Sequence, residues 1–353
     1  MKITVITPYD SSNFGAFLQA YCLKAQLEKM GHTVNHIMTR KPEYVRELYY
    51  KEKPTRKKDI LFRWRFEKKK AYGIRKFKLF QKDQKYFSIV QSNDAADVYI
   101  LGSDEIWNIN QSVFQKNIFW GRGLEPVISY AASIGNADIK ELTQAEKYVD
   151  DVKSLKAVLV RDIRTRKFVE SIGKQAEIVC DPTMLISVTA YGQEINDKYI
   201  STHRCFLVYA YYVSEKGKKA IKNYARKNGM KVVSCCFWHD WCDYQCECGP
   251  LKFSSLIRQC KAVFTTTFHG SIFSILNHAN FVSVPISTKT NQLLEQFGMQ
   301  ERLIEEEKIS ENMLDKILNS EHIDYYSVDE QITAIRKDSI GKLETALRIA
   351  NGG

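Results

Sequence analysis

Short runs typical of β-strands alternate with apolar helical patterns along most of this chain of 353 residues, and this alternation constrains its fold most. The first unit reads KITVITPY, GAFLQAYCLKAQLEKMGH and TVNHIM, which predicts a strand, a helix and a strand. Such a unit favours a parallel sheet with right-handed crossovers. The alternation resumes at ADVYILGSD and restarts at CFLVYAYY. We therefore predict an α/β protein with two Rossmann-like, doubly wound domains that face a cleft.

The places where the alternation breaks and restarts predict the domains. The chain is long enough for two domains of ordinary size. We expect the first domain to occupy residues 1–182 and the second to occupy residues 183–310. Residues 311–353 have a helical pattern, and we expect these helices to pack back on the first domain.

The formal net charge of +11 is concentrated in residues 46–85. This basic segment contains 16 Lys and Arg against 5 Asp and Glu, and 16 − 5 = +11, so the rest of the chain is neutral. Aromatic and aliphatic residues lie between the charges. The mix suits a basic amphipathic helix on an anionic membrane, a grip on a phosphate-bearing substrate, or a solvated helical insertion. We expect no nucleic-acid partner, because no nucleic-acid-binding motif accompanies the charge.

The N-terminal sequence MKITVITPYD contains no long apolar segment and no small-residue cleavage site. No stretch of the chain approaches the roughly 20 apolar residues of a membrane span. We therefore expect a cytoplasmic protein, which would be peripheral at the inner face of the membrane if the basic segment binds lipid.

Nine cysteines, an odd number in a long chain without an export signal, favour reduced thiols over a disulfide framework. One cysteine-rich stretch could still offer thiolates to zinc. Its members are Cys235, Cys236, His239, Cys242, Cys246 and Cys248, of which the last three cysteines form a C-x3-C-x-C pattern. Because paired C-x2-C units are absent from the sequence, we expect a solvent-facing loop here and no metal site.

Polar residues follow several predicted strands, where parallel sheets place their ligands. Asn13 and Gly15 lie in the first strand-to-helix turn, whose free N–H groups could bind an anion or a hydroxyl, or be capped by Asn13 itself. The turn is not a G-x-G-x-x-G sequence, so we expect no dinucleotide cofactor.

Two further strand ends carry charged residues. GSDEIWN places Ser103, Asp104 and Glu105 where short polar side chains could bind sugar hydroxyls and a carboxylate could act as general base; an ordinary capped turn is the alternative. VLVRD ends near Arg161, whose planar guanidinium suits a carboxylate or phosphate ligand, or a neighbouring acidic side chain.

The segment TTTFHGSIFSI predicts a strand that ends at His269 and a helix that begins at Gly270 and Ser271. A titratable side chain and an anion-binding helix N-terminus would then coincide. His269 could exchange a proton beside a bound phosphate, or could be a packed or capping histidine.

Six segments taken together resemble the polysaccharide pyruvyl transferase family, in the branch whose motif looks like SFHG. They are NFGAFLQAYCLKAQLEKMGH, DVYILGSDEIWN, SYAASIG, LVRDIRTRKFVESIG, VCDPTMLI and VFTTTFHGSIFSI. The resemblance runs in order over most of residues 1–303, apart from the basic segment. It implies two Rossmann-like domains arranged as in GT-B glycosyltransferases. It also implies transfer of the enolpyruvyl group of phosphoenolpyruvate to a sugar diol, which forms a pyruvate ketal in surface polysaccharide biosynthesis.

The resemblance further implies roles for two of these residues. His269 matches the family histidine suspected as general acid, and Arg161 matches an arginine that would bind the anionic groups of the donor. The expected sets are His269, Asp104 and Glu105 for catalysis; Arg161, Thr267, Gly270 and Ser271 for the donor; and Asn13, Gly15 and Ser103 for the acceptor or an anion. Phosphoenolpyruvate would be a co-substrate, no cofactor is expected, and the acceptor would be a lipid-linked or nucleotide-linked sugar.

Two positions depart from the family pattern. Thr267 stands where better-studied members carry arginine, so either Arg161 or a basic residue from elsewhere supplies the positive charge, or this branch uses another activated donor. Glu105 stands where many relatives have glutamine. Two other functions remain open: a GT-B-type glycosyltransferase with the diphosphate of a nucleotide sugar on the helix at Gly270, and a non-catalytic scaffold in a glycan-assembly complex.

Overall fold

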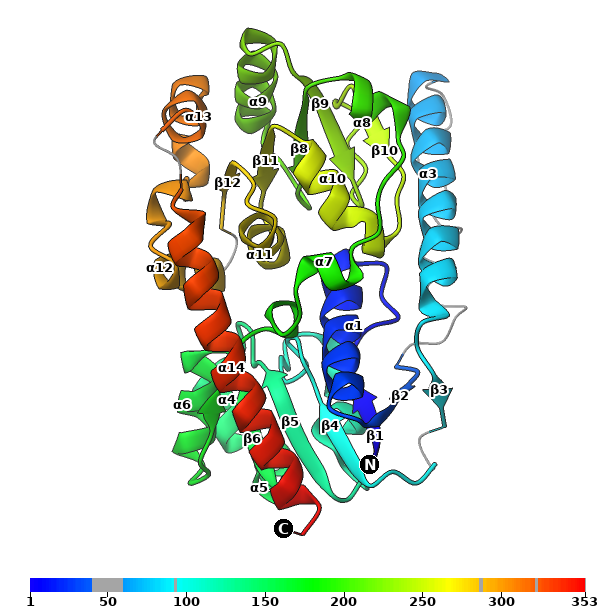
Figure 1. Cartoon of the computed structure of the whole chain (residues 1–353), viewed down its shortest axis with the longest axis vertical. Helices are drawn as coiled ribbons and strands as arrows, with labels where there is room; N and C mark the ends of the chain where they lie inside the picture. The colour runs from blue at the N-terminus through cyan, green and yellow to red at the C-terminus, as the bar shows by residue number, and fades with distance from the viewer. Residues whose placement is uncertain (40–59, 92–93, 286–287, 321–322, 353) are drawn as a thin grey trace.

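The computed structural model describes residues 1–39, 60–91, 94–285, 288–320 and 323–352 (Figure 1). It contains two parallel β-sheets with helices packed around them, one sheet in the lower half and one in the upper half of Figure 1. This architecture confirms the predicted α/β fold with two doubly wound units. Residues 46–59 of the basic segment lie outside the described residues.

The first sheet has seven parallel strands in the order β3-β2-β1-β4-β5-β6-β7. They are β1 (Lys2–Ile6), β2 (Thr33–Ile37), β3 (Ile89–Val90), β4 (Val98–Leu101), β5 (Val127–Ala132), β6 (Ala157–Val160) and β7 (Glu177–Ile178). The helices that connect them include α1 (Phe14–Lys29), α4 (Ile139–Gln144), α5 (Glu146–Ser154) and α6 (Ile163–Ser171). Every residue of β4 and β5 is buried, as continuous apolar runs in parallel sheets predict.

The second sheet has five parallel strands in the order β10-β9-β8-β11-β12. They are β8 (Cys205–Tyr209), β9 (Lys231–Cys235), β10 (Tyr244–Cys246), β11 (Ala262–Thr265) and β12 (Phe281–Ser283). The helices of this half are α7 (Val188–Tyr191), α8 (Lys198–Thr202), α9 (Glu215–Lys227), α10 (Phe253–Gln259), α11 (Phe268–Leu276), α12 (Thr288–Gln296) and α13 (Glu311–Leu318). Short 3-10 helices cover Ser112–Gln115, Asn117–Trp120, Pro182–Met184, Pro250–Lys252, Gln300–Arg302 and Glu306–Lys308.

The prediction of a solvent-facing loop over the cysteine-rich stretch is wrong. Residues Tyr244–Cys246 form β10, which pairs in parallel with β9, and the side chains of Cys246 and Cys248 are buried. Cysteine is small and apolar enough to fill the interior beside a paired strand.

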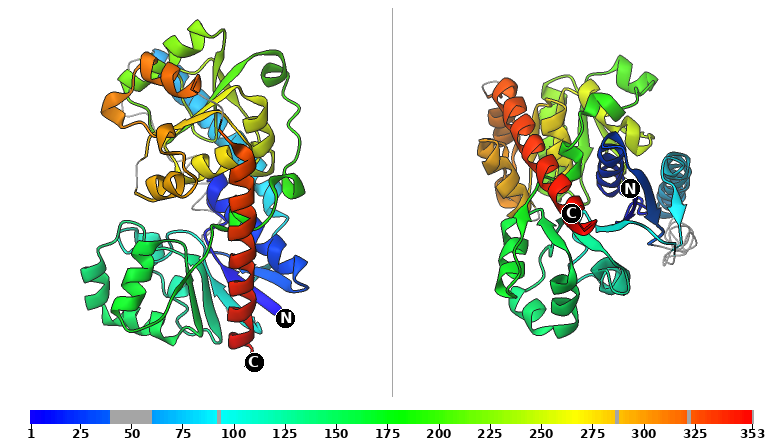
Figure 2. Two further views of the ribbon diagram at one scale, coloured as in Figure 1. Left: turned by 60° about the vertical axis from the view of Figure 1, so that its left-hand side comes forward. Right: turned by 60° about the horizontal axis from the view of Figure 1, so that its bottom comes forward.

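Two long helices each pack beside the sheet that they do not directly follow in the chain. α14 (Tyr325–Ala350) runs from beside the second sheet down along the first, where it packs against β5 and β6 (Figure 2). α3 (Ile60–Gln84) follows β2 of the first sheet but lies alongside the second sheet (Figure 1). The Tyr72 hydroxyl donates to the carbonyl oxygen of Cys246 at 3.4 Å, and Lys76 Nζ donates to that of Cys236 at 2.7 Å. None of the helices within the described ranges is long and apolar enough to span a bilayer.

The order of the strands places a switch point in each sheet. The chain leaves β1 for β2 and β3 and returns to the other side of β1 with β4; in the second sheet the same reversal separates β8 from β11. Loops that leave neighbouring strands in opposite directions open a crevice at the carboxyl ends of those strands. The residues after β1, β4, β8 and β11 therefore lie at these crevices.

Candidate functional site

A cavity of about 520 Å³, here called the cleft cavity, is lined by residues that follow all four of these strands. Among them are Ser12 and Asn13 after β1, Asp104 and Glu105 after β4, Tyr211 after β8, and Thr267 and His269 after β11. The two switch points therefore meet at one cavity. Of the residues expected to act in catalysis, all three line it, and so do Arg161 and Thr267.

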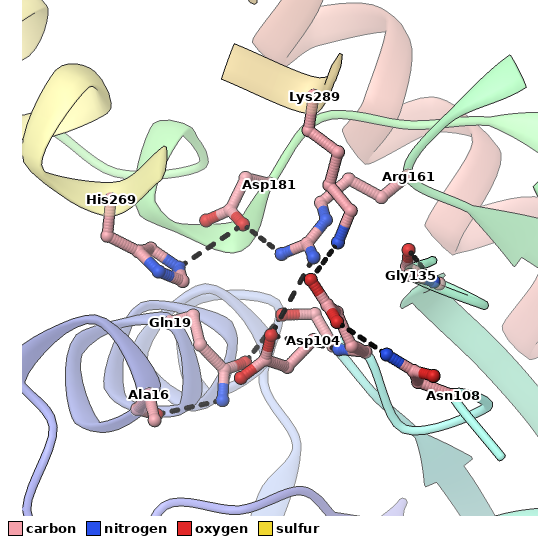
Figure 3. A network of polar contacts seen from close by, with 12 residues as sticks. Ala16, Gln19, Asp104, Asn108, Gly135, Arg161, Asp181, His269 and Lys289 are labelled. Carbon is pink, nitrogen blue, oxygen red and sulfur yellow. Dashed lines mark hydrogen bonds and ion pairs between the residues drawn. The ribbon is translucent and has the colours of Figure 1, made fainter. Parts of the chain in front are cut away.

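A chain of charged side chains crosses this region (Figure 3). Arg161 Nη1 donates to Asp181 Oδ2 at 2.9 Å, and Arg161 Nη2 lies 3.7 Å from Asp104 Oδ1. His269 Nε2 lies 3.6 Å from the same Asp181 oxygen, which is an ion-pair distance and too long for a hydrogen bond. Asp181 therefore links the arginine that follows the first sheet's β6 to the histidine of the second sheet's α11.

Local hydrogen bonds fix the Asp181 carboxylate between Arg161 and His269. The other carboxylate oxygen, Oδ1, accepts hydrogen bonds from the backbone N–H of Thr183 at 3.1 Å and from its hydroxyl at 2.8 Å, which caps the 3-10 helix Pro182–Met184. Burial raises the pKa of Asp181, but His269 and Arg161 outweigh it and hold that pKa below its ordinary value. Burial lowers the pKa of Arg161, while Asp181 and Asp104 raise it, and the net pKa is raised. The pair is therefore ionised, and each charge depends on the other.

Two buried nitrogen atoms at this cavity lack hydrogen bonds. Within the described part of the chain, neither Arg161 Nε nor His269 Nε2 has a hydrogen-bond partner. A buried polar group left unsatisfied costs about 1–3 kcal/mol. Both side chains line the cleft cavity, so an anionic ligand bound there could satisfy them.

Lys289 of α12 lies beside Arg161 (Figure 3) and forms a second ion pair, with Glu105. Lys289 Nζ donates to Glu105 Oε1, and Asn108 Nδ2 donates to Glu105 Oε2 at 2.9 Å. Gly135 has φ +60° and lies so close that a Cβ atom there would overlap Glu105 Oε2, so the close approach requires glycine.

The pKa values of Glu105 and Lys289 are both shifted by burial and by neighbouring charges. Burial raises the pKa of Glu105, but Lys289 and Asn108 outweigh it and the net pKa is lowered. Burial and the charge of Arg161 lower the pKa of Lys289, and Glu105 only partly offsets them. Arg161 and Lys289 thus provide positive charge at the cavity. Thr267, which stands where better-studied family members have arginine, provides none.

His269 does not end a strand, which corrects the sequence prediction. β11 ends at Thr265, and α11 begins at Phe268, so His269 lies in the first turn of the helix. The reason is a cap: the Thr267 side chain accepts a hydrogen bond from the N–H of Gly270 at 2.9 Å. Thr267 lines the cavity, but this amide of the helix N-terminus is already bonded.

Ser271 and Ser103, expected to bind the donor and the acceptor, are buried behind the cavity lining and form hydrogen bonds within the protein. Ser271 is buried and its hydroxyl lies 2.9 Å from that of Ser283. Ser103 is also buried and donates to Gln19 Oε1 at 2.6 Å. Neither side chain is among those that line the cleft cavity.

Asn13 joins the two halves of the molecule. Its Oδ1 accepts the N–H of Gly15 at 2.8 Å, which caps α1, and its Nδ2 donates to the Tyr211 hydroxyl at 2.7 Å. The capping alternative therefore describes its oxygen, while its amide nitrogen reaches a residue that follows β8. A Cβ atom at Gly15 would overlap the imidazole of His269, so this glycine makes room for the histidine.

Sequence reasoning missed Asp181, Lys289 and Lys76. Asp181 lies inside the quoted segment VCDPTMLI, but Lys289 lies outside every quoted segment and carries no local signal. Lys76 belongs to the basic segment and lines the cleft cavity, so α3 brings a third cation to it. Of the alternatives given for the basic segment, binding of a phosphate-bearing substrate is the one that accounts for Lys76 at the cavity.

A second cavity, of about 630 Å³, adjoins the first and shares Arg161, Phe268 and Lys289 with it. Its remaining walls come largely from apolar residues, including Leu293 of α12 and Ile335 of α14. A ligand with an anionic and an apolar part could therefore extend from one cavity into the other.

Comparison with known proteins supports the sequence-based resemblance. The family model for polysaccharide pyruvyl transferase matches residues 13–288, a range that includes Asn13, His269 and every strand between them. A search of curated proteins finds no significant match.

Solved structures share the fold at very low sequence identity. A UDP-N-acetylglucosamine 2-epimerase has a TM-score of 0.54 at 11% identity, over 99% of this chain and 95% of that one. The UDP-GlcNAc 2-epimerase of Methanocaldococcus jannaschii has a TM-score of 0.51 at 12% identity, over 91% and 94%. The spinosyn forosaminyltransferase SpnP has a TM-score of 0.50 at 8% identity and covers 100% of both chains. These similarities confirm the GT-B-like arrangement and carry no information on substrates.

Proposed function

Since this chain belongs to the polysaccharide pyruvyl transferase family, we propose that it transfers the enolpyruvyl group of phosphoenolpyruvate to two hydroxyls of a sugar. The product is a pyruvate ketal on a surface polysaccharide or its precursor. The observation that carries this proposal is a pair of buried nitrogen atoms, Arg161 Nε and His269 Nε2, that have no hydrogen bond within the described residues and belong to side chains lining a cavity with three cations.

The charge of the cavity suits this donor. Phosphoenolpyruvate carries a carboxylate and a phosphate, and the cavity offers the three cations Arg161, Lys289 and Lys76. A guanidinium binds planar or tetrahedral oxyanions through paired hydrogen bonds, whereas an ammonium acts as a point charge. Lys289 and Lys76 take the part that an arginine at position 267 plays in better-studied relatives.

The reaction needs one proton delivered to carbon and two hydroxyl additions. In the first step a sugar hydroxyl oxygen bonds to C2 of the donor while a proton moves to C3, which becomes a methyl group. In the second step a neighbouring hydroxyl replaces phosphate at C2, and inorganic phosphate leaves with its bonding electron pair. His269 delivers the proton to C3, and Asp181 holds its ring in position. Asp104 and Glu105 are the bases for the acceptor hydroxyls.

The second cavity suits the part of the acceptor that is not sugar. Its apolar walls fit the lipid or the nucleobase of a lipid-linked or nucleotide-linked sugar, and it opens onto the same Arg161 and Lys289. The sugar would then lie at the boundary between the two cavities.

We place the protein in the cytoplasm, with α3 as its contact with an anionic inner membrane face. Arg65, Lys68 and Lys69 are exposed on this helix, and Trp64 is 56% exposed. Tyr72 and Phe80 are buried in the protein, so this contact relies on charge and on Trp64 and not on an inserted apolar face.

The direct test incubates the purified protein with phosphoenolpyruvate and a panel of lipid-linked and nucleotide-linked sugars. The expected result is phosphate release that requires an acceptor, with a product heavier than the acceptor by one pyruvate less one water. A methyl signal in the product NMR spectrum identifies the ketal, because a simple enolpyruvyl ether of equal mass keeps a methylene group. Consumption of a nucleotide sugar without phosphoenolpyruvate would favour the glycosyltransferase instead, and co-purified assembly enzymes without turnover would favour the scaffold.

A further inference from the structure

Three cysteine side chains meet at one buried point between β9, β10 and α3. Cys235 ends β9, Cys246 ends β10, and Cys248 follows two residues later. Their Sγ atoms all lie within 4.8 Å of one another, and those of Cys235 and Cys248 are 3.4 Å apart. All three residues are buried. We call them the thiol cluster.

We propose that the thiol cluster binds a zinc ion. Zinc bound by cysteine has Zn–S distances of about 2.3 Å in a tetrahedron, so its sulfur ligands lie roughly 3.8 Å apart. That spacing falls within the range that these three sulfur atoms span. Binding replaces three thiol protons by one dication, and the protons pass to solvent. Thiolates favour soft or borderline ions, and zinc needs no redox partner.

The strand pairing explains why the cluster was not recognised in the sequence. Cys246 is the register partner of Cys235 in the parallel pairing of β10 with β9, so the two side chains point to the same face. The pattern of Cys242, Cys246 and Cys248 contains only two of the three members. Cys242 lies outside the cluster, and His239 Nε2 bonds to the Ala210 carbonyl oxygen at 2.8 Å.

The surroundings suit a bound cation with three thiolates. Three thiolates and one Zn²⁺ carry a net charge of −1 and leave a fourth position for water. Lys76 donates to the carbonyl of Cys236, the residue next to Cys235, and Arg75 pairs with Glu247 at 2.7 Å, between the other two cysteines. Both cations come from α3, so this helix contacts the two segments that carry the cysteines.

The zinc would also support one wall of the cleft cavity. Cys236 has a left-handed backbone, with φ +68°, and Phe237 follows it and lines the cavity. The Phe237 ring packs against Tyr211 at a centroid distance of 4.5 Å. A metal at Cys235 would hold this turn, and it would take no part in the chemistry proposed above.

The test is the metal content of the full-length protein, purified without chelator and after removal of any affinity tag. Elemental analysis should find one zinc per chain. Cys246→Ser and Cys248→Ser should lose it, while the matched control Cys242→Ser should keep it. Wild-type protein with substoichiometric metal after dialysis against zinc and then buffer would overturn the proposal.

Two further measurements remain decisive if a variant fails to fold. Replacement of zinc by Co²⁺ in the wild-type protein should give the intense visible bands of tetrahedral cobalt and the near-ultraviolet charge transfer of cobalt thiolate. Thiol titration of the unfolded protein without reductant should count all nine cysteines. Two missing thiols and no metal, with the disulfide mapped to the cluster by peptide mass spectrometry, would refute the zinc site. Neither measurement depends on enzyme activity, so failure here leaves the proposed function standing.

Discussion

The imidazole of His269 lies against the backbone of Gly15, at the point where the second sheet's α11 meets the N-terminus of the first sheet's α1. A Cβ atom at Gly15 would overlap Nδ1 of the ring. The histidine therefore reaches the cleft cavity through space that a glycine leaves open. Each half of the molecule provides one side of this contact.

Gly15→Ala should displace His269 and lower kcat/KM by about tenfold or more, since small misplacements of a catalytic group are costly. Steady-state kinetics and thermal denaturation measure the effect. Gly341→Ala in α14 is the matched control: its Cβ would meet no atom within 4 Å, and the change should leave activity intact. Unchanged turnover in Gly15→Ala would show that catalysis does not need the ring where it lies.

His269→Gln should lower kcat by about 10²- to 10⁴-fold, the usual contribution of a general acid, while the folded structure persists. Thermal shift with phosphoenolpyruvate should still detect donor binding, because Arg161 and the lysines remain. His203→Gln, at an exposed histidine, serves as control. Substantial turnover in His269→Gln would remove this residue from the proton transfer.

Asp181→Asn should reduce both activity and stability, because Arg161 and His269 lose the charge that they share. The folded-state pKa of Asp181 lies below its unfolded value, so its stabilisation is complete above an unfolded-state pKa of about 3.9. It decreases as the pH falls below that value toward the lower folded-state pKa.

Urea denaturation of wild type and Asp181→Asn at pH 7 and pH 3 checks this sign. The difference in unfolding free energy should be larger at pH 7. Asp329→Asn, at an exposed ion pair with His278, should cause a much smaller loss at pH 7. An Asp181 difference that grows toward acid pH would contradict the ionised pair.

Lys289→Met should raise the KM for phosphoenolpyruvate by about tenfold, as expected for loss of one charge-assisted contact. Lys289→Arg keeps the charge and should be affected less. The methionine variant also leaves the partly buried Glu105 without its cation, so it should be less stable. Adding Glu105→Gln should restore stability but not donor affinity; restored affinity would place Lys289 outside the donor site.

Reversal of charge at Arg65, Lys68 and Lys69 should abolish salt-sensitive binding to vesicles that contain anionic phospholipid. Co-sedimentation at low and high salt measures it. Reversal at the exposed Lys140, Lys219 and Lys316 is the control for net charge. Deletion of residues 46–85 is unsuitable because Tyr72 and Phe80 belong to the core. Equal binding by both variants would argue against α3 as the contact.

The departures of this chain from the family pattern acquire a physical account in the structure. Thr267 caps α11, and the positive charge near the cavity comes from Arg161, Lys289 and Lys76. Glu105, in place of glutamine, pairs with Lys289. A neutral amide would not balance a buried ammonium in the same way.

The sequence by itself determined the α/β class and the two doubly wound units, because hydrophobic periodicity and turn residues are local properties. It also indicated His269, Arg161, Asp104 and Glu105, since strand ends at a parallel sheet are where ligands bind. Its errors were local as well. The start of α11 depended on whether Thr267 or a later residue capped the helix, and β10 was too short to show a period.

Only the tertiary structure decided which side chains meet. Asp181, Lys289 and Lys76 come from three separate elements, and Cys235 joins Cys246 through the register of two strands. A charged side chain becomes part of a site when burial removes water and brings its partner close, and neither event is encoded in the neighbouring residues. The cations that line the cleft cavity and the thiol cluster thus come together through packing between segments that are distant in the chain.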